Sequence, residues 1–436
     1  MRKQMNRRSF ILSIPAAAAL SVFTCSNGEK QKREKNPVFI NGLTLEEHRD
    51  ELIDRLYNEY LPFWENGGYD KQLGGFICNL DENGVPVDEN KFIWYQGRGI
   101  WVYSFLYNNF GQDSKYLEIA KHTRDFMVKH MYAGNGQWAE TVRSNGEVIK
   151  GVGPESNIYG WLFAANGLAE YFRISGNEED LELVIESVMA AQKAYDSPQY
   201  RKGTDFEGLR IQGHSMIFVR LLTRLLDDYD HAELRKLRDL HLDHLMTRFY
   251  HPGFKISNEE LLHDYSRIKG KEGTMFMGHS LEAQWMVMHA ALLKNDQNLF
   301  DSAKNNFRRY LEMGWDYNFD GWGSEDYYVY AGPNNVQGPD FSTKTMWAHT
   351  EILVGCMTVL EHTGECWAKD WYERTWRYIK KTFCRGIGAW EQAVNRYGEP
   401  ISREKWGIHP MRRGNYHQPR FLMMNILSLD RMINKR

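Results

Sequence analysis

Apolar residues recur along most of the chain at helical spacing, and short polar breaks interrupt this pattern. Five breaks carry Gly, Asn or Asp, and they lie within "LYNNFGQDSKYLEIA", "AEYFRISGNEEDLELV", "LLTRLLDDYDHAELRKL", "AALLKNDQNLFDSA" and "VLEHTGECWAKDWY". Such residues end helices, and an amphipathic segment follows each break. The breaks fall roughly 50 to 70 residues apart, which leaves room for a helical hairpin and a connection. The pattern therefore predicts a series of helical hairpins.

A second, shorter pattern recurs in some of the connections. The segments "GFICNLDENGVPV", "QWAETVRSNGEVI" and "AWEQAVNRYGEPI" align without gaps, with Gly84, Gly146 and Gly398 at equivalent positions. Alternating apolar residues around Asn-Gly or Tyr-Gly predict a short β-hairpin. We therefore expect small β-hairpins to join some of the helical hairpins.

Two more helical segments, "TLEEHRDELIDRLYNEYLPFW" and "NYHQPRFLMMNILSLDRMI", stand at the ends of this series and bring the predicted helix pairs to six. Helical hairpins joined by small β-hairpins suggest a toroid with an inner and an outer ring of helices. An open helical solenoid is the alternative. In both arrangements the inner helices face a central cavity, which suits a small polar ligand better than a large partner.

The composition agrees with a large folded domain and argues against nucleic-acid binding. Of the 436 residues, 42% are hydrophobic and 14% aromatic, so the chain can bury a sizeable core. The formal net charge is -3, and no basic stripe is present. The 14 Trp and 24 Tyr residues could stack on sugar rings, although core packing explains such aromatics equally well.

Residues 1–37 have the pattern of an export signal and a linker, which leaves 38–436 as a single predicted catalytic domain. Arg and Lys residues precede the apolar run "FILSIPAAAALSVF", which is too short for a comfortable membrane span. "NRRSF" resembles a twin-arginine motif. We therefore expect an exported protein, periplasmic or membrane-anchored. Lipidation at Cys25 and simple cleavage are both open.

Four histidines lie in apolar settings near predicted helix starts: His214, His279, His349 and His417. His279 and Glu282 are three residues apart and share a helix face, whereas His349 and Glu351 are two apart and would point in different directions. A neutral imidazole near a helix N-terminus can serve as a general base. A satisfied core histidine is the alternative. Without HExxH or a defined third ligand, no metal site is predicted.

Other catalytic patterns are absent from the sequence. There is no G-x-S-x-G elbow, no phosphate-binding G-x-x-x-x-G-K-[ST] loop and no G-x-G-x-x-G opening a strand–helix unit. Glu325 and Asp326 could be paired carboxylates of a glycosidase, a hypothesis that depends on the distance between the two carboxyl groups.

Five motifs occur in order along the chain: "YQGRGIWVYSFLY", "GHSLEAQW", "TKTMWAHTEIL", "AVNRYGEP" and "NYHQPRF". Together they resemble the N-acylglucosamine 2-epimerase family, whose relatives include cellobiose 2-epimerases and aldose–ketose isomerases, from about Leu45 to Arg431. The resemblance implies an all-α (α/α)6 barrel and an epimerase without cofactor or metal. In this family a proton is removed beside the carbonyl of an opened sugar, an enediolate forms, and the proton returns. Such chemistry needs two acid/base groups on opposite faces and donors for the developing oxyanion.

The resemblance also implies roles for single residues. His279 and His417 would be the acid/base pair, with Glu282 supporting His279. Arg98 would stabilise the negative oxygen, because it is always charged and carries several donors. The remaining motif residues would bind the sugar or line the site: Trp347, His349, Glu351 and Tyr95.

The chain departs from the family pattern in places. Ala348 stands where many relatives have proline, the segment "GSEDYYVYAGPNNVQGPDFS" does not match, and His214 has no secure counterpart. The W-x-H-x-E motif favours a monosaccharide over cellobiose. Export suggests a substrate met outside the cytoplasm.

The sequence thus predicts a sugar 2-epimerase for N-acylglucosamine, N-acylmannosamine or a related aldose. Alternatives of the same class are an aldose–ketose isomerase, such as a mannose isomerase, and a cellobiose or mannobiose 2-epimerase. An exported glycoside hydrolase or lyase and a glycan-binding protein are alternatives of other classes. A small sugar is the expected partner, and a homodimer is open.

Overall fold

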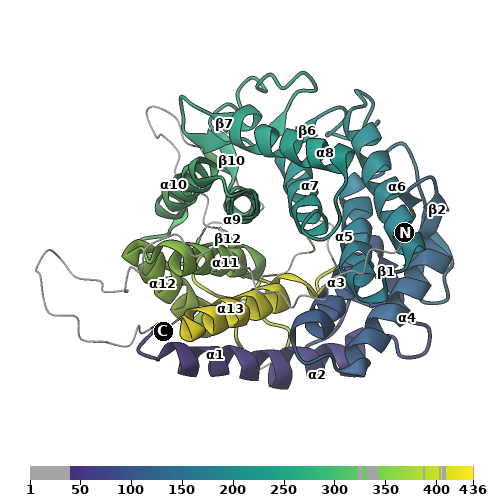
Figure 1. Cartoon of the computed structure of the whole chain (residues 1–436), viewed down its shortest axis with the longest axis horizontal. Helices are drawn as coiled ribbons and strands as arrows, with labels where there is room; N and C mark the ends of the chain where they lie inside the picture. The colour runs from purple at the N-terminus through teal and green to yellow at the C-terminus, as the bar shows by residue number, and fades with distance from the viewer. Residues whose placement is uncertain are drawn as a thin grey trace, which may run out of the picture.

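The helices of this protein form an inner and an outer ring (Figure 1). The computed structural model describes residues 40–322, 328–330, 342–385, 388–401, 404 and 409–435. The inner ring contains α3 (Ile93–Asn109), α5 (Ile158–Ser175), α7 (Gln212–Leu225), α9 (Met277–Lys294), α11 (Met346–Thr363) and α13 (His417–Asn434). The outer ring contains α1 (Leu45–Asp54), α4 (Ser114–Met131), α6 (Glu178–Tyr195), α8 (Ala232–Asp243), α10 (Gln297–Gly314) and α12 (Cys366–Thr382). Shorter helical segments extend α1 and α8: η1 (Arg55–Tyr60), α2 (Leu61–Phe63), η2 (Trp64–Gly68) and η3 (His244–Arg248).

The ring is closed by its last helix. Each inner helix packs against one outer helix and against its inner neighbours, and α13 contacts both α1 and α3. In Figure 1 the yellow α13 lies beside the purple α1 at the lower edge of the ring. Closure confirms the all-α (α/α)6 toroid and excludes the open solenoid.

The predicted breaks are the ends of inner helices. Gly176, Asn295 and Gly364 adopt the left-handed conformation after α5, α9 and α11, with φ of 61°, 54° and 70°. This conformation is the usual helix stop for Gly and Asn. The side chains of Asn177 and Asp296 then cap the first N–H groups of α6 and α10. The inner-to-outer turns are therefore encoded locally.

The three aligned connection segments fold into the same tight turn, as predicted. Gly84, Gly146 and Gly398 have φ of 83°, 91° and 85°, which residues with a Cβ rarely adopt. Each glycine donates its N–H to the carbonyl oxygen three residues earlier. The turns therefore explain why glycine stands at this position in all three segments.

Short antiparallel strand pairs gather at one end of the toroid. Four strands run directly into α3, α7, α9 and α11: β1 (Asn90–Phe92), β6 (Arg210–Ile211), β10 (Thr274–Phe276) and β12 (Thr343–Thr345). They pair with β4 (Thr141–Arg143), β9 (Glu260–Leu261), β11 (Tyr328–Tyr330) and β13 (Ala393–Asn395). The other strands are β2 (Tyr132–Gly134), β3 (Gln137–Trp138), β5 (Val148–Lys150), β7 (Tyr250–His251) and β8 (Ile256–Ser257). This end therefore carries the N-termini of the inner helices and the long connections.

Two buried lysines tie these connections to the barrel. Lys91 in β1 lies 2.8 Å from Asp70, and Lys344 in β12 lies 3.1 Å from Asp316, in both cases from Nζ to Oδ2. Both lysines are fully buried, and both also donate to backbone carbonyl oxygens. A buried charge is tolerated only when it is paired, so these contacts fix the strands that lead into α3 and α11.

Some predictions fall on residues that the structure does not describe. These are the signal and linker over 1–37, Cys25, and the pair Glu325 and Asp326. The single catalytic domain from residue 38 stays a prediction. Within the described part of the chain, no helix is both long enough and apolar enough to span a bilayer.

Candidate active site

His417 is the first residue of α13, and a carboxylate from the neighbouring inner helix orients its ring. Nδ1 of His417 lies 2.8 Å from Oε1 of Glu351 in α11. The other carboxylate oxygen accepts from Trp285 Nε1 at 2.9 Å and from Arg420 Nη2 at 2.6 Å. Arg420 Nη2 also lies 3.2 Å from His417 Nδ1, but a guanidinium only donates, so the shorter contact assigns the ring proton to Nδ1. His417 is therefore held in the tautomer whose lone pair is on Nε2.

The surroundings of His417 keep its ring neutral. Burial is the main cause that lowers its pKa well below the ordinary value, and the charges of Arg420 and Arg98 lower it further. Burial raises the pKa of Glu351, and the charge of Arg420 acts against this rise. A neutral imidazole oriented by a carboxylate can accept a proton, as a general base must.

Arg420 is fully buried and bridges two carboxylates. Its Nη2 donates to Oε1 of Glu282 as well as to Glu351. The expected support of His279 by Glu282 is therefore corrected, because Glu282 turns toward the arginine of α13 instead. Ligand atoms of Glu282, Glu351 and His417 lie within 4.8 Å of one another, as metal ligands would. These groups already contact the Arg420 guanidinium, so the cluster is an ion-paired network around an internal cation.

His279 lies in the first turn of α9, and its carboxylate partner comes from a strand connection. Nδ1 of His279 is 2.8 Å from Oε1 of Glu259, which lies between β8 and β9. The His279 side chain is 19% exposed, so it retains some access to solvent. Both candidate histidines therefore have the same arrangement. Nδ1 contacts a glutamate, and Nε2 is the nitrogen that would exchange a proton.

Trp347 lies close to both histidine rings. Its ring centroid is 5.5 Å from that of His279 and 5.3 Å from that of His417. A Cβ on Gly278 would lie 2.3 Å from the Trp347 ring, so glycine is needed for this close approach. Among the described residues, the buried Nε1 of Trp347 has no hydrogen-bond partner. The indole is thus a neighbour of both histidines and has a donor left for a ligand.

Arg98 brings a buried positive charge to the same region from α3. The residue is 7% exposed, and its guanidinium carbon lies 4.2 Å from the centroid of Phe163 and 5.3 Å from that of Tyr416. Among the described residues, Arg98 forms one hydrogen bond, from Nη2 to the Tyr159 hydroxyl at 3.3 Å. Its buried Nε has no hydrogen-bond partner among those residues. Tyr95 lies beside it, at 5.8 Å from the ring centroid. A buried guanidinium with spare donors is suited to bind a negative oxygen.

The match to a protein family agrees with this arrangement. The family model described as N-acylglucosamine 2-epimerase (GlcNAc 2-epimerase) matches residues 74–412. The chain belongs to the N-acylglucosamine 2-epimerase family. Members of this family are carbohydrate epimerases, which are isomerases.

Relatives of known name match this chain over most of its length. The bovine (Bos taurus) N-acylglucosamine 2-epimerase is 23% identical over 408 residues, which cover 90% of this chain and 93% of the relative. A cellobiose 2-epimerase from Bacillus thermoamylovorans has the same fold, with a TM-score of 0.73 at 17% identity over 88% of this chain and 99% of its own. A D-mannose isomerase structure has a TM-score of 0.69 at 15% identity, covering 88% and 97% of the two chains.

His349 is placed differently from the sugar-binding role that the family motif suggests. Its Nδ1 donates to the Thr345 carbonyl oxygen at 2.7 Å, and its Nε2 accepts from the Trp322 backbone N–H at 3.1 Å. The ring is fully buried and stacks on Tyr378, and burial lowers its pKa to about 3. Both ring nitrogens are thus engaged with the backbone, so His349 links the first turn of α11 to the Trp322 backbone rather than contacting a sugar. The expected divergence of His349 and Glu351 on the helix is confirmed.

Replacing His349 with glutamine tests this correction. We expect the free energy of unfolding, measured by urea denaturation, to fall by about 1–3 kcal/mol, because at least one buried backbone group loses its partner. The value of kcat/KM per folded molecule should stay at the wild-type level. A higher KM with unchanged stability would restore the sugar-binding role.

Two residues of the candidate site, Glu259 and His214, had no role assigned from the sequence. Glu259 stands in "SNEELL", where nothing distinguishes it from a surface acid. His214, in the first turn of α7, was noticed but had no role. Its Nε2 lies 3.1 Å from Asn157 Oδ1, and its buried Nδ1 has no partner among the described residues. Burial, followed by the charges of Arg201 and His279, lowers its pKa to about 3. His214 is therefore a neutral polar group close to His279.

Proposed function

We propose that this protein is a sugar 2-epimerase in which His279 and His417 exchange the proton at C2 of an opened aldose. The observation that carries the proposal is the pair of imidazoles that both lie close to Trp347, each with Nδ1 on a glutamate. Epimerisation needs removal of a proton from one face of a carbon and its return on the other. Two histidine bases gathered around one indole supply the two groups that this reaction needs.

The proposed reaction begins with an open-chain sugar whose C2 lies between the two Nε2 atoms. One histidine takes the C2 proton, the C–H electron pair forms the C1–C2 double bond, and the carbonyl oxygen becomes negative. The other histidine, protonated, then returns a proton to the opposite face, and the carbonyl forms again. In the reverse reaction the histidines exchange roles, as microscopic reversibility requires.

Arg98 is the proposed partner of the negative oxygen. Its buried guanidinium is held by aromatic rings and has spare donors, so it needs no rearrangement when charge develops. The Arg420 network would hold Glu351, and through it His417, in a fixed orientation. Trp347 would stack against the sugar, with its indole N–H as a donor to a hydroxyl.

The proposed substrates are N-acylglucosamine and N-acylmannosamine or a related aldose. The bovine relative supports an N-acylated sugar. The fold shared with a mannose isomerase keeps one alternative, in which the proton returns to C1 and a ketose forms. Both reactions pass through the same enediolate, so the position of the returned proton separates them.

Proton exchange in D2O tests the proposed function. The purified protein is incubated with N-acetylglucosamine, N-acetylmannosamine, mannose, glucose, cellobiose and mannobiose, and NMR follows the C1 and C2 protons. We expect loss of the C2 signal with formation of the 2-epimer for at least one sugar. Deuterium at C1 with a ketose product would indicate the isomerase. Hydrolysis without exchange, or no change with any sugar, would contradict the proposal.

We also propose that the protein is exported, which the basic start and apolar run of residues 1–37 support. A lipid anchor at Cys25 and a homodimer are finer proposals of the same kind. The intact mass of the protein purified from its own cells decides the first two, because cleavage and acylation change it by known amounts. Sedimentation decides the third.

A further inference from the structure

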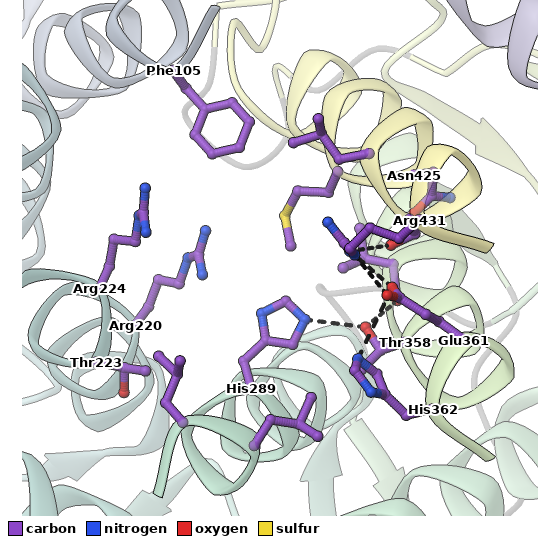
Figure 2. Close-up of a pocket in the computed structure, with 16 residues that line it drawn as sticks. Phe105, Arg220, Thr223, Arg224, His289, Thr358, Glu361, His362, Asn425 and Arg431 are labelled. Atoms are coloured by element: carbon purple, nitrogen blue, oxygen red, sulfur yellow. Dashed lines mark hydrogen bonds and ion pairs between the residues drawn. The ribbon is translucent and has the colours of Figure 1, made fainter. Parts of the chain in front are cut away.

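A cavity lies at the end of the toroid where the inner helices end (Figure 2). It has a volume of about 70 Å³, enough for a small ion with water. Its polar lining comes from the last turns of α7, α9, α11 and α13: Arg220, Thr223, Arg224, His289, Thr358, Glu361, His362, Asn425, Ser428 and Arg431. His417 and Arg431 are on the same helix, and a rise of 1.5 Å per residue separates them by about 20 Å along its axis. The Arg431 side of the cavity is therefore far from the histidine site, whereas Arg220 lies close enough to Glu351 for its charge to oppose the rise that burial causes in the pKa of that carboxyl.

Arg220 is the unusual residue of this cavity. It is 7% exposed, and in the described parts of the chain it forms no hydrogen bond and no ion pair. Its guanidinium carbon lies 5.4 Å from the centroid of Trp285 and 5.9 Å from that of Trp101. Figure 2 shows its side chain directed into the cavity. A buried cation that makes no direct ion pair is costly, so a ligand that supplies one would bind favourably.

The other charged groups around the cavity are already paired, and they leave it positive. Arg224 Nε donates to Glu170 at 3.3 Å, and Arg431 forms a two-point ion pair with Glu361. Burial lowers the pKa of His289 well below its ordinary value, so this ring adds no charge. Glu361 is the single carboxylate among the lining residues, against three arginines.

An uncharged hydrogen-bond donor near Arg220 also suits a ligand that carries negative charge. Thr223, one helical turn from Arg220, has a buried hydroxyl with no hydrogen-bond partner among the described residues. In Figure 2, Arg220, Thr223 and Arg224 line one side, opposite the Arg431–Glu361 pair. We propose that this cavity is a binding site for a small oxyanion, a phosphate or carboxylate group, held chiefly by the Arg220 guanidinium. A planar guanidinium matches the two oxygens of either group.

Anion titration of the full-length protein tests the proposal. Isothermal titration calorimetry uses inorganic phosphate and, in a second arm, butyrate, with ionic strength held constant by sodium chloride. We expect saturable binding at one site for at least one anion. The anion that binds more tightly shows whether the site prefers a phosphate or a carboxylate group. R220Q should weaken binding about tenfold or more, because a charge-assisted hydrogen bond is lost. No saturable binding by the wild-type protein in either arm would overturn the proposal.

Two matched variants locate the bound anion. Arg377 is an exposed arginine of α12, with a side chain that is 62% exposed, and R377Q should bind like the wild type. Arg98 is the buried arginine at the histidine end, and R98Q should also bind the anion with unchanged affinity. If R98Q abolishes binding while R220Q does not, the anion occupies the histidine site and the proposal fails. If R220Q does not fold, T223V replaces it, and wild-type affinity in T223V overturns the proposal.

Discussion

Replacing His417 with glutamine is expected to lower kcat for epimerisation by about 10²- to 10⁴-fold, the usual contribution of a general acid or base. Glutamine can keep a hydrogen bond to Glu351 Oε1, which in the wild type lies 2.8 Å from the ring, but it cannot exchange a proton. The buried ion pair between Arg420 and Glu351 should therefore survive, and the protein should fold. Product formation and the exchange of the C2 proton in D2O should fall together.

The matched control for this variant is His48→Gln. His48 is fully buried, and its ring contacts Glu51 and Tyr372 on the outer side of the barrel. It should keep wild-type kcat per folded molecule.

The pH profile adds a second readout, because the pKa of His417 is lowered by burial and by Arg420 and Arg98. The base form is already present below pH 6.5, so the acid limb of kcat/KM that reports His417 should lie below this value. An active His417→Gln protein would contradict the assigned role.

Replacing Arg98 with glutamine should lower kcat by about 10²- to 10³-fold, the loss typical of a missing oxyanion donor. The charge on the carbonyl oxygen exists in the enediolate and not in the bound aldose, so kcat should change more than KM. Lysine at this position keeps the charge but not the fork of donors. R98K should therefore recover part of the lost activity.

The stability of the R98Q protein separates this role from a structural one. Arg98 is 7% exposed, and among the described residues it forms a hydrogen bond to Tyr159 alone. Removing a buried, poorly paired cation is often neutral or stabilising. Thermal unfolding of R98Q should therefore occur at or above the wild-type temperature, while activity falls. A large loss of stability, with kcat restored when the protein is measured at low temperature, would indicate a structural residue.

Much of the fold could be predicted because its signals are local. Gly176, Asn295 and Gly364 end helices whether or not the ring closes, since a left-handed residue stops a helix by its own backbone geometry. The glycines of the three repeated turns act in the same way. The hairpin pattern suggested a closed ring but left an open solenoid as the alternative, and the contact of α13 with α1 and α3 decides for the ring.

The partners within the site could not be predicted in this way. Helical spacing placed His279 beside Glu282, because residues three apart share a face. The structure instead pairs His279 with a glutamate 20 residues earlier, and Glu282 with an arginine 138 residues later. A hydrogen bond requires atoms about 3 Å apart, and helical periodicity does not fix such distances between separate elements.

The sequence by itself determined the helical hairpins, their stops, the repeated glycine turns and the position of His279 and His417 at the starts of inner helices, because these depend on neighbours along the chain. The tertiary structure alone decided which carboxylate orients each histidine, why His349 is bound to backbone groups, and where Arg220 meets a cavity. These depend on how six helix pairs close into one ring. Closure brings side chains that are distant in sequence into contact, and burial then sets their charge.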